Sequence, residues 1–309
     1  MMKGKRIKAC LICNPFAGKI KNNLKVIELI ISYFRDEAYE INKMITNGPL
    51  TAMQIAKEEA KKATDIIIVL GGDGTINEVA NGIYGSESAL MIIPMGTANL
   101  LAHHINLPTK IHSALKAYKE SAIIKINVGK ANDRYFLLMV GIGFDGYIIS
   151  KITPSIKFKY GKLAYAYHSI KESFLYKYPL FSVKINNKEI NSSFAVISLS
   201  KEYAGLLSLT PDVDITKNNF QICLFHRRGA LSFWKYFLFA LIRKHNKLSD
   251  VTLTFSDNLE IYSNNDSNIW SQIDGELFSK LPLTISLAQK KLNLIVPLAI
   301  KLNYQQLKN

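Results

Sequence analysis

The sequence has 309 residues, of which 48% are hydrophobic and 20% charged, so it is long enough for two domains and too apolar for a disordered chain. Three cysteines exclude a disulfide framework, and no apolar run approaches the ~20 residues of a membrane-spanning helix. The net charge of +15 fits nucleic acid, an anionic membrane surface or a polyanionic substrate as a partner, but also a merely solvated lysine-rich surface. We expect a cytoplasmic protein, because the N-terminal apolar stretch is short and runs into Asn14-Pro15, unlike a signal peptide.

Strand and helix patterns alternate over the first 125 residues. The expected strands cover residues 5–14, 39–46, 65–70 and 89–94. The expected helices cover residues 24–38, 50–63, 76–83, 97–105 and 110–120. The expected strand 65–70 is apolar at every position after Asp65, which is typical of a buried parallel strand. The alternation predicts an α/β domain with a doubly wound parallel sheet.

After about residue 125 the pattern changes to short strands separated by Asn, Asp, Gly and Ser. The expected strands cover residues 125–130, 134–143, 180–186, 193–200, 220–225, 250–255, 259–263, 269–273 and 283–287. Two helices, 158–176 and 230–245, interrupt them. This part of the sequence predicts an antiparallel sandwich or barrel.

The segment VLGGDGTINEVANGI, residues 69–83, joins an expected buried strand to a helix. Apolar residues recur with helical spacing at positions 76, 79, 80 and 83. Thr75 is a suitable N-cap, and Glu78, three residues later, completes a predicted capping box. We expect both residues to have this structural role whatever else they do.

The glycines of this segment exceed what a helix cap requires. Gly71, Gly72 and Gly74 expose backbone N–H groups at the positive end of a helix dipole, which predicts an anion site. Asp73 would be repelled by a phosphate unless a cation or a transferred proton lies between them. We therefore interpret Asp73 as a magnesium-linked or charge-organising residue, with an Asx-turn that closes the loop as the structural alternative.

Two further loops leave strand ends at the same predicted sheet edge: NPFAGK, residues 14–19, and PMGTANLLA, residues 94–102. A doubly wound sheet binds ligands at these strand ends. The loops therefore predict a nucleotide site, for which the candidate residues are Asn14, Gly18, Lys19, Gly96, Thr97 and Asn99.

These motifs, followed by GIGFDG at 141–146 and DGE at 274–276, resemble the diacylglycerol kinase catalytic family of lipid kinases. The resemblance implies a nucleotide-binding domain, residues 1–125, to which residues 293–309 return. It implies a C-terminal β-sandwich domain, residues 126–292, for the lipid acceptor, with the active site in the cleft between the domains. The implied reaction uses ATP and magnesium and transfers the γ-phosphoryl group to a diacylglycerol-like hydroxyl.

The resemblance also implies roles for single residues. Thr46 would contact the nucleotide, and Thr97 would line its pocket. The phosphates would lie against Gly71, Gly72, Asp73, Gly74, Thr75, Ile76 and Asn77, with Glu78 as the last residue of the set. We expect the partner to be a lipid substrate at an anionic membrane surface, where the basic protein attaches peripherally. We expect no nucleic acid, and a homodimer stays open.

Chemistry supports a role for DGE independently, because a lipid hydroxyl is a poor nucleophile and a carboxylate can accept its proton. We favour Glu276 as the base and Asp274 as its partner, with Asp73 as the third candidate catalytic residue. On a strand the first two would share a face, whereas in a turn around Gly275 they would diverge. The alternative is a solvated Asp-Gly hairpin turn without catalytic function.

Two positions depart from the family pattern. Leu100 follows GTAN where the family commonly has an aspartate, and Lys217-Asn218 stand where it has an Asp-Gly linked to a structural magnesium. We therefore predict no structural metal. Three readings of the function stay open: a lipid kinase, a kinase of NAD or another small molecule, and a catalytically weak lipid- or nucleotide-binding regulator.

Membrane contact has two candidate segments. Lys151, Lys157, Lys159 and Lys162 precede or open the expected helix 158–176 and are candidate contacts with anionic lipid. Residues 231–247 are aromatic on most sides and basic at their end, which fits either a buried helix or one at a membrane interface.

Overall fold

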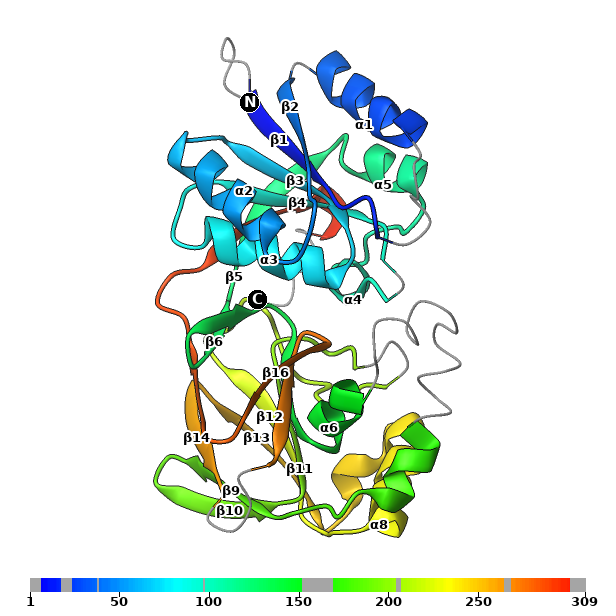
Figure 1. The fold of residues 1–309 in the computed structure, drawn as a ribbon, viewed down its shortest axis with the longest axis vertical. Helices are drawn as coiled ribbons and strands as arrows, with labels where there is room; N and C mark the ends of the chain where they lie inside the picture. The colour runs from blue at the N-terminus through cyan, green and yellow to red at the C-terminus, as the bar shows by residue number, and fades with distance from the viewer. Residues whose placement is uncertain are drawn as a thin grey trace. The chain divides into compact units, whose positions relative to one another are not determined.

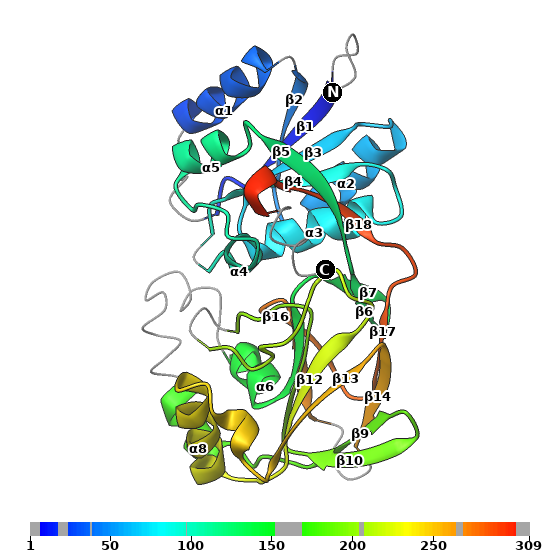
Figure 2. The same ribbon diagram turned by 180° about the vertical axis from the view of Figure 1, so that it is seen from behind.

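The computed structural model describes residues 7–17, 24–37, 39–96, 98–151, 169–203, 207–263 and 268–300. The chain forms two compact units. Unit 1 comprises Met1–Val128 and Gln289–Asn309, and unit 2 comprises Gly129–Ala288. Figures 1 and 2 show the elements of each unit from two sides.

Unit 1 is built on a six-stranded sheet with the order β2-β1-β3-β4-β18-β5. Its strands are β1 (Ile7–Cys13), β2 (Tyr39–Ile45), β3 (Ile66–Gly71), β4 (Ala89–Pro94), β5 (Ser121–Ile126) and β18 (Leu292–Pro297). All neighbours pair in parallel except β18 and β5, which are antiparallel. Every residue of β3 and β4 is buried, as expected for the centre of a parallel sheet. The predicted α/β fold is confirmed, and the strand expected at 125–130 instead divides between β5 and the next unit.

The helices of unit 1 are α1 (Leu24–Asp36), α2 (Thr51–Lys61), α3 (Asp73–Ile83), α4 (Leu100–His104) and α5 (Ile111–Ala117). The pairs α1/α5 and α2/α3 lie on opposite faces of the sheet (Figures 1 and 2). The Tyr33 hydroxyl donates to the carbonyl oxygen of Leu115 at 2.9 Å and joins the first pair. In the second pair, a Cβ on Gly82 would lie 2.4 Å from the carbonyl oxygen of Met53, so only glycine allows this approach.

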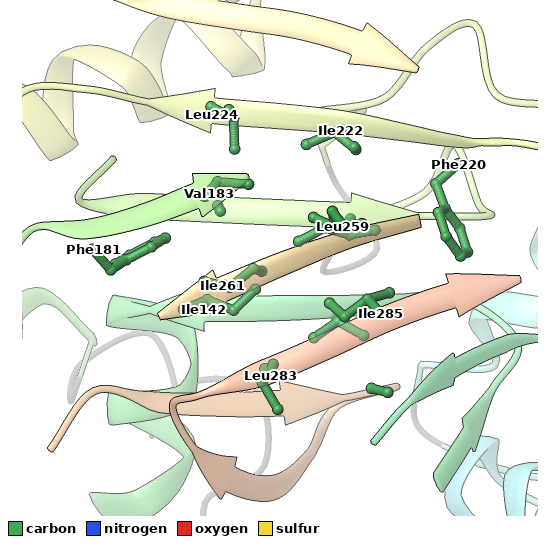
Figure 3. Close-up of a cluster of buried hydrophobic side chains, with 14 of the residues drawn as sticks. Ile142, Phe181, Val183, Phe220, Ile222, Leu224, Leu259, Ile261, Leu283 and Ile285 are labelled. Carbon is green, nitrogen blue, oxygen red and sulfur yellow. The ribbon is translucent and has the colours of Figure 1, made fainter. Parts of the chain in front are cut away.

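Unit 2 is a sandwich of two antiparallel sheets with the orders β10-β9-β14-β17-β6-β7 and β13-β12-β11-β8-β15-β16. The first contains β6 (Gly129–Ala131), β7 (Arg134–Phe136), β9 (Phe181–Ile185), β10 (Lys188–Ser192), β14 (Asn258–Tyr262) and β17 (Leu283–Leu287). The second contains β8 (Met139–Gly143), β11 (Phe194–Ser198), β12 (Phe220–Phe225), β13 (Val251–Ser256), β15 (Trp270–Ile273) and β16 (Glu276–Lys280). Side chains from both sheets meet in one buried core, including Val183 and Ile261 from the first and Ile142 and Ile222 from the second (Figure 3). The predicted antiparallel sandwich is confirmed.

Unit 2 also carries α6 (Phe144–Lys151), a helix at residues 169–175, α8 (Ala230–Leu241) and the short helix η1 (His245–Lys247). Most of the helix expected at 158–176 lies outside the described residues, as do Lys157, Lys159 and Lys162. A second apolar cluster, including Phe144, Tyr178 and Phe233, anchors α6 and α8 to the sandwich. Among the described residues no helix combines the length and hydrophobicity needed to cross a bilayer.

Candidate functional site

Four loops of unit 1 follow the carboxyl ends of β1 to β4, and backbone hydrogen bonds join three of them to the ends of neighbouring strands. Asn14, after β1, donates its N–H to the carbonyl oxygen of Leu70 at 3.1 Å. Thr46, after β2, donates its N–H to Cys13 at 2.9 Å and is buried. Met95, after β4, donates its N–H to the last residue of β3 at 2.9 Å. The predicted convergence of the loops at one sheet edge is therefore observed.

Asn14 connects the first loop to α3. Its Nδ2 donates to Thr75 Oγ1 at 2.9 Å, and its Oδ1 accepts the N–H of Phe16 at 2.9 Å. The side chain is thus fixed at both ends between the loop and the first turn of the helix. The predicted site residue Gly18 and its neighbour Lys19 lie outside the described residues.

The start of α3 differs from the predicted capping box. The helix begins at Asp73 with Gly72 in the N-cap position, and no side chain caps it. Thr75 lies inside the first turn and accepts the bond from Asn14, because the glycines let the helix begin three residues earlier than its apolar pattern does. The capping-box prediction for Thr75 and Glu78 is therefore wrong.

Glu78 instead binds the start of the neighbouring helix. Its Oε1 accepts the N–H of Leu50 at 3.0 Å, and its Oε2 accepts the N–H of Ala52 at 3.1 Å. Leu50 is the N-cap of α2 and provides no side-chain cap of its own. Glu78 therefore satisfies amides of α2 across the α2/α3 contact, a role that local sequence spacing does not reveal.

Gly72 and Gly96 bring the second and third glycine-bearing loops into backbone contact. A Cβ on Gly96 would lie 2.6 Å from the Cα of Gly72, and one on Gly72 would lie 3.1 Å from the Cα of Gly96. Asn99 closes the Gly96 loop, since its Oδ1 accepts the N–H of Gly96 at 2.7 Å and its Nδ2 donates to the Gly96 oxygen at 2.9 Å. Asn99 has a φ of 50°, a conformation that asparagine tolerates well. Thr97, between them, lies outside the described residues.

Asp73 faces the beginning of α4. Its Oδ1 accepts the N–H of Leu101 at a long 3.5 Å. Burial raises the pKa of Asp73, and the backbone N–H groups of Leu101, Leu100 and Asn99 act in the opposite direction. Leu100, where the family commonly has an aspartate, is buried. Asp73 is thus a partly desolvated carboxylate that links the two glycine-bearing loops.

The remaining predicted residues of α3 point into the protein. The side chains of Ile76 and Asn77 are 1% and 2% exposed. Asn81 donates its Nδ2 to Asn77 Oδ1 at 3.1 Å. Ile76 therefore belongs to the core, and its contribution to a bound anion would be limited to its backbone. Gly71 packs against Thr75, since an added Cβ would lie 2.7 Å from the Thr75 Cβ.

The DGE segment of unit 2 forms the tight turn between β15 and β16. Asp274 and Gly275 have φ values of 51° and 86°, and Ile273 pairs with Glu276, as in a two-residue hairpin. Asp274 is 5% exposed. Its Oδ2 accepts the N–H of Leu137, and its Oδ1 accepts those of Leu138 and Met139, each at 2.9 Å.

These three amides explain a further difference from the sequence expectation. The strand predicted at 134–143 is divided into β7 and β8 at Leu137 and Leu138, whose N–H groups bind Asp274 instead of a sheet neighbour. The hairpin-turn alternative is right about the backbone but wrong about solvation, because the Asp274 carboxylate is buried and fully engaged.

Glu276 diverges from Asp274. It is partly exposed, and its Oε2 forms an ion pair with Arg134 Nη2 at 2.6 Å. Arg134 is 142 residues away in the chain, so no local pattern in the sequence could have found it. The turn geometry thus separates the two carboxylates, one inward onto backbone amides and one outward onto an arginine.

Asp145 and Gln272 form a buried network beneath this turn. Gln272 Nε2 donates to Asp145 Oδ2 at 2.8 Å, and Gln272 Oε1 accepts the N–H of Gly275 at 2.7 Å. Burial raises the pKa of Asp145 to about 6, while hydrogen bonds from Gln272 and Tyr203 hold it lower than burial alone would. The one sequence feature that singled out Asp145 was its place in the GIGFDG motif. No sequence feature indicated Gln272.

The segment around Lys217 uses its acidic residues locally. Asp214 Oδ1 accepts both the N–H and the hydroxyl of Thr216 at 2.8 Å, and Asp212 Oδ2 accepts Gln221 Nε2 at 3.1 Å. Across the parts of the chain that the structure describes, no group of three or more His, Cys, Asp or Glu residues is arranged to hold a metal ion.

Comparisons with known proteins find similarity to one family of kinases. Residues 8–131 match the family described as diacylglycerol kinase catalytic domain. A diacylglycerol kinase of Staphylococcus saprophyticus is 28% identical over 306 residues, covering 96% of this chain and 97% of the relative. One of Bacillus subtilis is 24% identical over 295 residues, covering 94% and 96%. A crystal structure of a diacylglycerol kinase from Bacillus anthracis superposes with a TM-score of 0.75 at 25% identity and covers 96% of this chain and all of that one.

Proposed function

Because this chain is a lipid kinase of the diacylglycerol kinase catalytic family, we propose that it transfers the γ-phosphoryl group of ATP, in the presence of magnesium, to the hydroxyl of a diacylglycerol-like lipid. The observation that supports nucleotide binding is that the loops after β1, β3 and β4 contact one another around the start of α3. The diacylglycerol acceptor follows from what the relatives are named.

The start of α3 supports phosphate binding on physical grounds. The first amides of this 11-residue helix have no side-chain cap, and Gly72 in the N-cap position leaves backbone access open. Uncapped amides and the helix dipole together attract anions. The contact between Gly72 and Gly96 holds the second and third loops in register for this purpose.

Magnesium fits this chain as an ion held mainly by the phosphates and water. Mg²⁺ commonly keeps several waters and takes only one or two carboxylates in nucleotide sites, so a single protein carboxylate would be enough. Asp73 is the carboxylate of the nucleotide set that would serve it. When bound, the ion would neutralise charge on the transferred phosphoryl group.

Glu276 is the proposed general base, since its carboxylate is partly exposed and so accessible to an acceptor. It would take the proton of the lipid hydroxyl while the oxygen bonds to phosphorus and the bond to the leaving ADP breaks. Arg134 restrains the orientation of this carboxylate through the 2.6 Å ion pair. Asp274 has no free lone-pair direction comparable to that of Glu276, so we assign it to positioning the turn.

The test is phosphate transfer from γ-labelled ATP with magnesium to a panel of diacylglycerol, phosphatidylglycerol, a long-chain base and NAD. Label in extracted phosphatidic acid is the expected result, and Glu276→Gln should reduce it by about 10²–10⁴-fold. Glu260→Gln is the matched control, because Glu260 on β14 is also a solvent-accessible glutamate that pairs with a basic side chain. Its partner is Lys184, at 3.7 Å. Label in NAD alone would make the chain a small-molecule kinase, and ATP binding without transfer to any acceptor would make it a regulator.

A further inference from the structure

Helix α8 has an inner apolar face that anchors it to unit 2. The ring centroids of Phe233 and Phe144 are 4.5 Å apart, and those of Tyr236 and Phe225 are 4.8 Å apart. Tyr236 and Ala240 are buried. This face is what a helix packed on one side of a sandwich requires.

The same helix carries a second apolar face that points to solvent. Leu231, Leu238, Leu241 and Ile242, here called the outer stripe, are 86%, 59%, 45% and 58% exposed. Their spacing of seven, three and one residues places them within about 100° of the helix circumference, opposite the inner face. Large apolar side chains gathered in this way on a surface mark an interaction site. The helix is thus part of the core on one side, as the first sequence alternative expected, and carries an exposed apolar surface on the other.

The helix at residues 169–175 extends the apolar surface. Its side chains Ile170, Phe174 and Leu175 are 49%, 63% and 62% exposed. Trp234 Nε1 of α8 donates to Ser173 Oγ of this helix at 3.0 Å, so the two helices are held side by side (Figures 1 and 2).

The surroundings of these helices are strongly basic. Residues 169–180 and 226–250 contain eight Lys or Arg residues and two acidic ones, Glu172 and Asp250. Both acids are engaged: Glu172 Oε2 accepts the Tyr147 hydroxyl at 2.6 Å, and Asp250 pairs with Lys235 and Arg227 at 2.7 and 3.1 Å. The exposed Arg243, Lys244 and Lys247 follow directly after the outer stripe.

We propose that the outer stripe together with Ile170, Phe174 and Leu175 is the surface by which this protein docks on an anionic lipid bilayer. The apolar side chains enter the boundary between headgroups and acyl chains, while the surrounding lysines and arginines contact anionic headgroups. The proposal rests on the proposed function, because a kinase of a membrane lipid must reach its acceptor at the bilayer. A second copy of the chain is disfavoured as the occupant, since a symmetric contact would bring the two basic surroundings together.

The test is flotation of the full-length protein, without ATP, on vesicles of equal parts phosphatidylcholine and phosphatidylglycerol and on vesicles of phosphatidylcholine alone. The wild type should bind the anionic vesicles more strongly, and salt should weaken this binding. The double variant Leu231→Gln/Leu238→Gln should lower the partition coefficient by about tenfold or more. Ile123→Gln, at a 54% exposed position of β5 in unit 1, is the control and should bind as the wild type does.

A second variant tests the charges separately. Arg243→Gln/Lys244→Gln should weaken binding to anionic vesicles and reduce its dependence on salt, while leaving the helix intact. Binding of the double-leucine variant at the wild-type level would overturn the proposal, as would equal wild-type binding to both kinds of vesicle. Dissociation of a wild-type dimer by the leucine changes, measured by sedimentation, would assign the surface to a second copy instead.

Phosphorylation of diacylglycerol dispersed in detergent micelles separates this inference from the proposed function. The leucine variant should retain wild-type turnover there, because its residues lie outside the catalytic set. Failure of every lipid acceptor with normal vesicle binding would sink the kinase proposal and leave the docking surface standing.

Discussion

Replacing Asp274 by asparagine should destabilise unit 2, because the buried carboxylate accepts hydrogen bonds from three backbone amides. The amides are those of Leu137, Leu138 and Met139, each 2.9 Å from a carboxylate oxygen. Asparagine keeps the size of the side chain and tolerates the φ of 51°, so backbone strain does not enter the comparison.

The magnitude follows from what asparagine can offer. Its single carbonyl oxygen can serve Leu138 and Met139, but its NH₂ group then faces the N–H of Leu137. One buried donor left unsatisfied costs about 1–3 kcal/mol, and two bonds lose the strength of a charged acceptor. We expect unit 2 to lose about 2–4 kcal/mol of unfolding free energy. Glu276→Gln breaks only a partly exposed ion pair and should cost about 0–1 kcal/mol.

Urea unfolding followed by tryptophan fluorescence measures this directly. Both tryptophans of the protein, Trp234 and Trp270, lie in unit 2, so the signal reports on that unit alone. The rate of phosphate transfer per folded molecule should rank the two variants in the opposite order. Glu276→Gln should lower this rate more than Asp274→Asn does. Equal stability of Asp274→Asn and the wild type would refute the anchoring role. A changed magnesium dependence of that variant would instead make Asp274 an ion-organising residue.

Three further outcomes are expected. Burial raises the pKa of Asp145 from 3.8 to about 6, so the folded state favours the protonated form, and the stability this contributes below about pH 4 is lost as the pH rises through about 6. The free energy of unfolding of Asp145→Asn, relative to that of the wild type, should therefore rise by up to about 3 kcal/mol between pH 4 and pH 7. Urea midpoints at the two pH values measure this rise, and a difference that does not change with pH would contradict it. Gly96→Ala should weaken ATP binding at least about tenfold, because its Cβ would lie 2.6 Å from the Cα of Gly72 and force the loops apart, whereas Gly48→Ala, with open space around the new Cβ, should match the wild type in a titration with ATP. Glu78→Ala should lower the unfolding free energy of unit 1 by about 1 kcal/mol, because it leaves amides in the first turn of α2 without their acceptor; an unchanged amide-exchange rate there would rule out this cap.

The Gly96 contact also changes what a substitution at Gly72 would show. Gly72→Val should abolish ATP binding in a folded protein, because the side chain removes the backbone approach to phosphate that glycine allows. The structure gives Gly72 a second constraint, since a Cβ there would lie 3.1 Å from the Cα of Gly96. A loss of binding in that variant would therefore not separate a phosphate contact from displacement of the loops.

The sequence identified the fold through periodicity and run length. The apolar runs at 66–70 and 89–94 become β3 and β4 within one residue, because a strand buried on both faces must be apolar throughout. Local spacing was less reliable at the helix start, where Thr75 and Glu78 had the spacing of a capping box but bind Asn14 and the start of α2. Their partners are 61 and 28 residues away, and nothing in a short window distinguishes a local from a distant acceptor.

What the sequence by itself determined was the chemistry available at each loop: glycines before a helix, a carboxylate among them, and an acidic pair around a glycine. Only the tertiary structure decided which of these groups remain available. The left-handed backbone at Asp274 and Gly275 turns one carboxylate onto three buried amides and leaves Glu276 outside with Arg134. The two-residue spacing in DGE is compatible with either a shared face or divergence, and the choice depends on amides 135 to 137 residues away. Long-range contacts of this kind carry no periodic signal along the chain, which is why the roles of the two acids could be assigned only after the chain was folded.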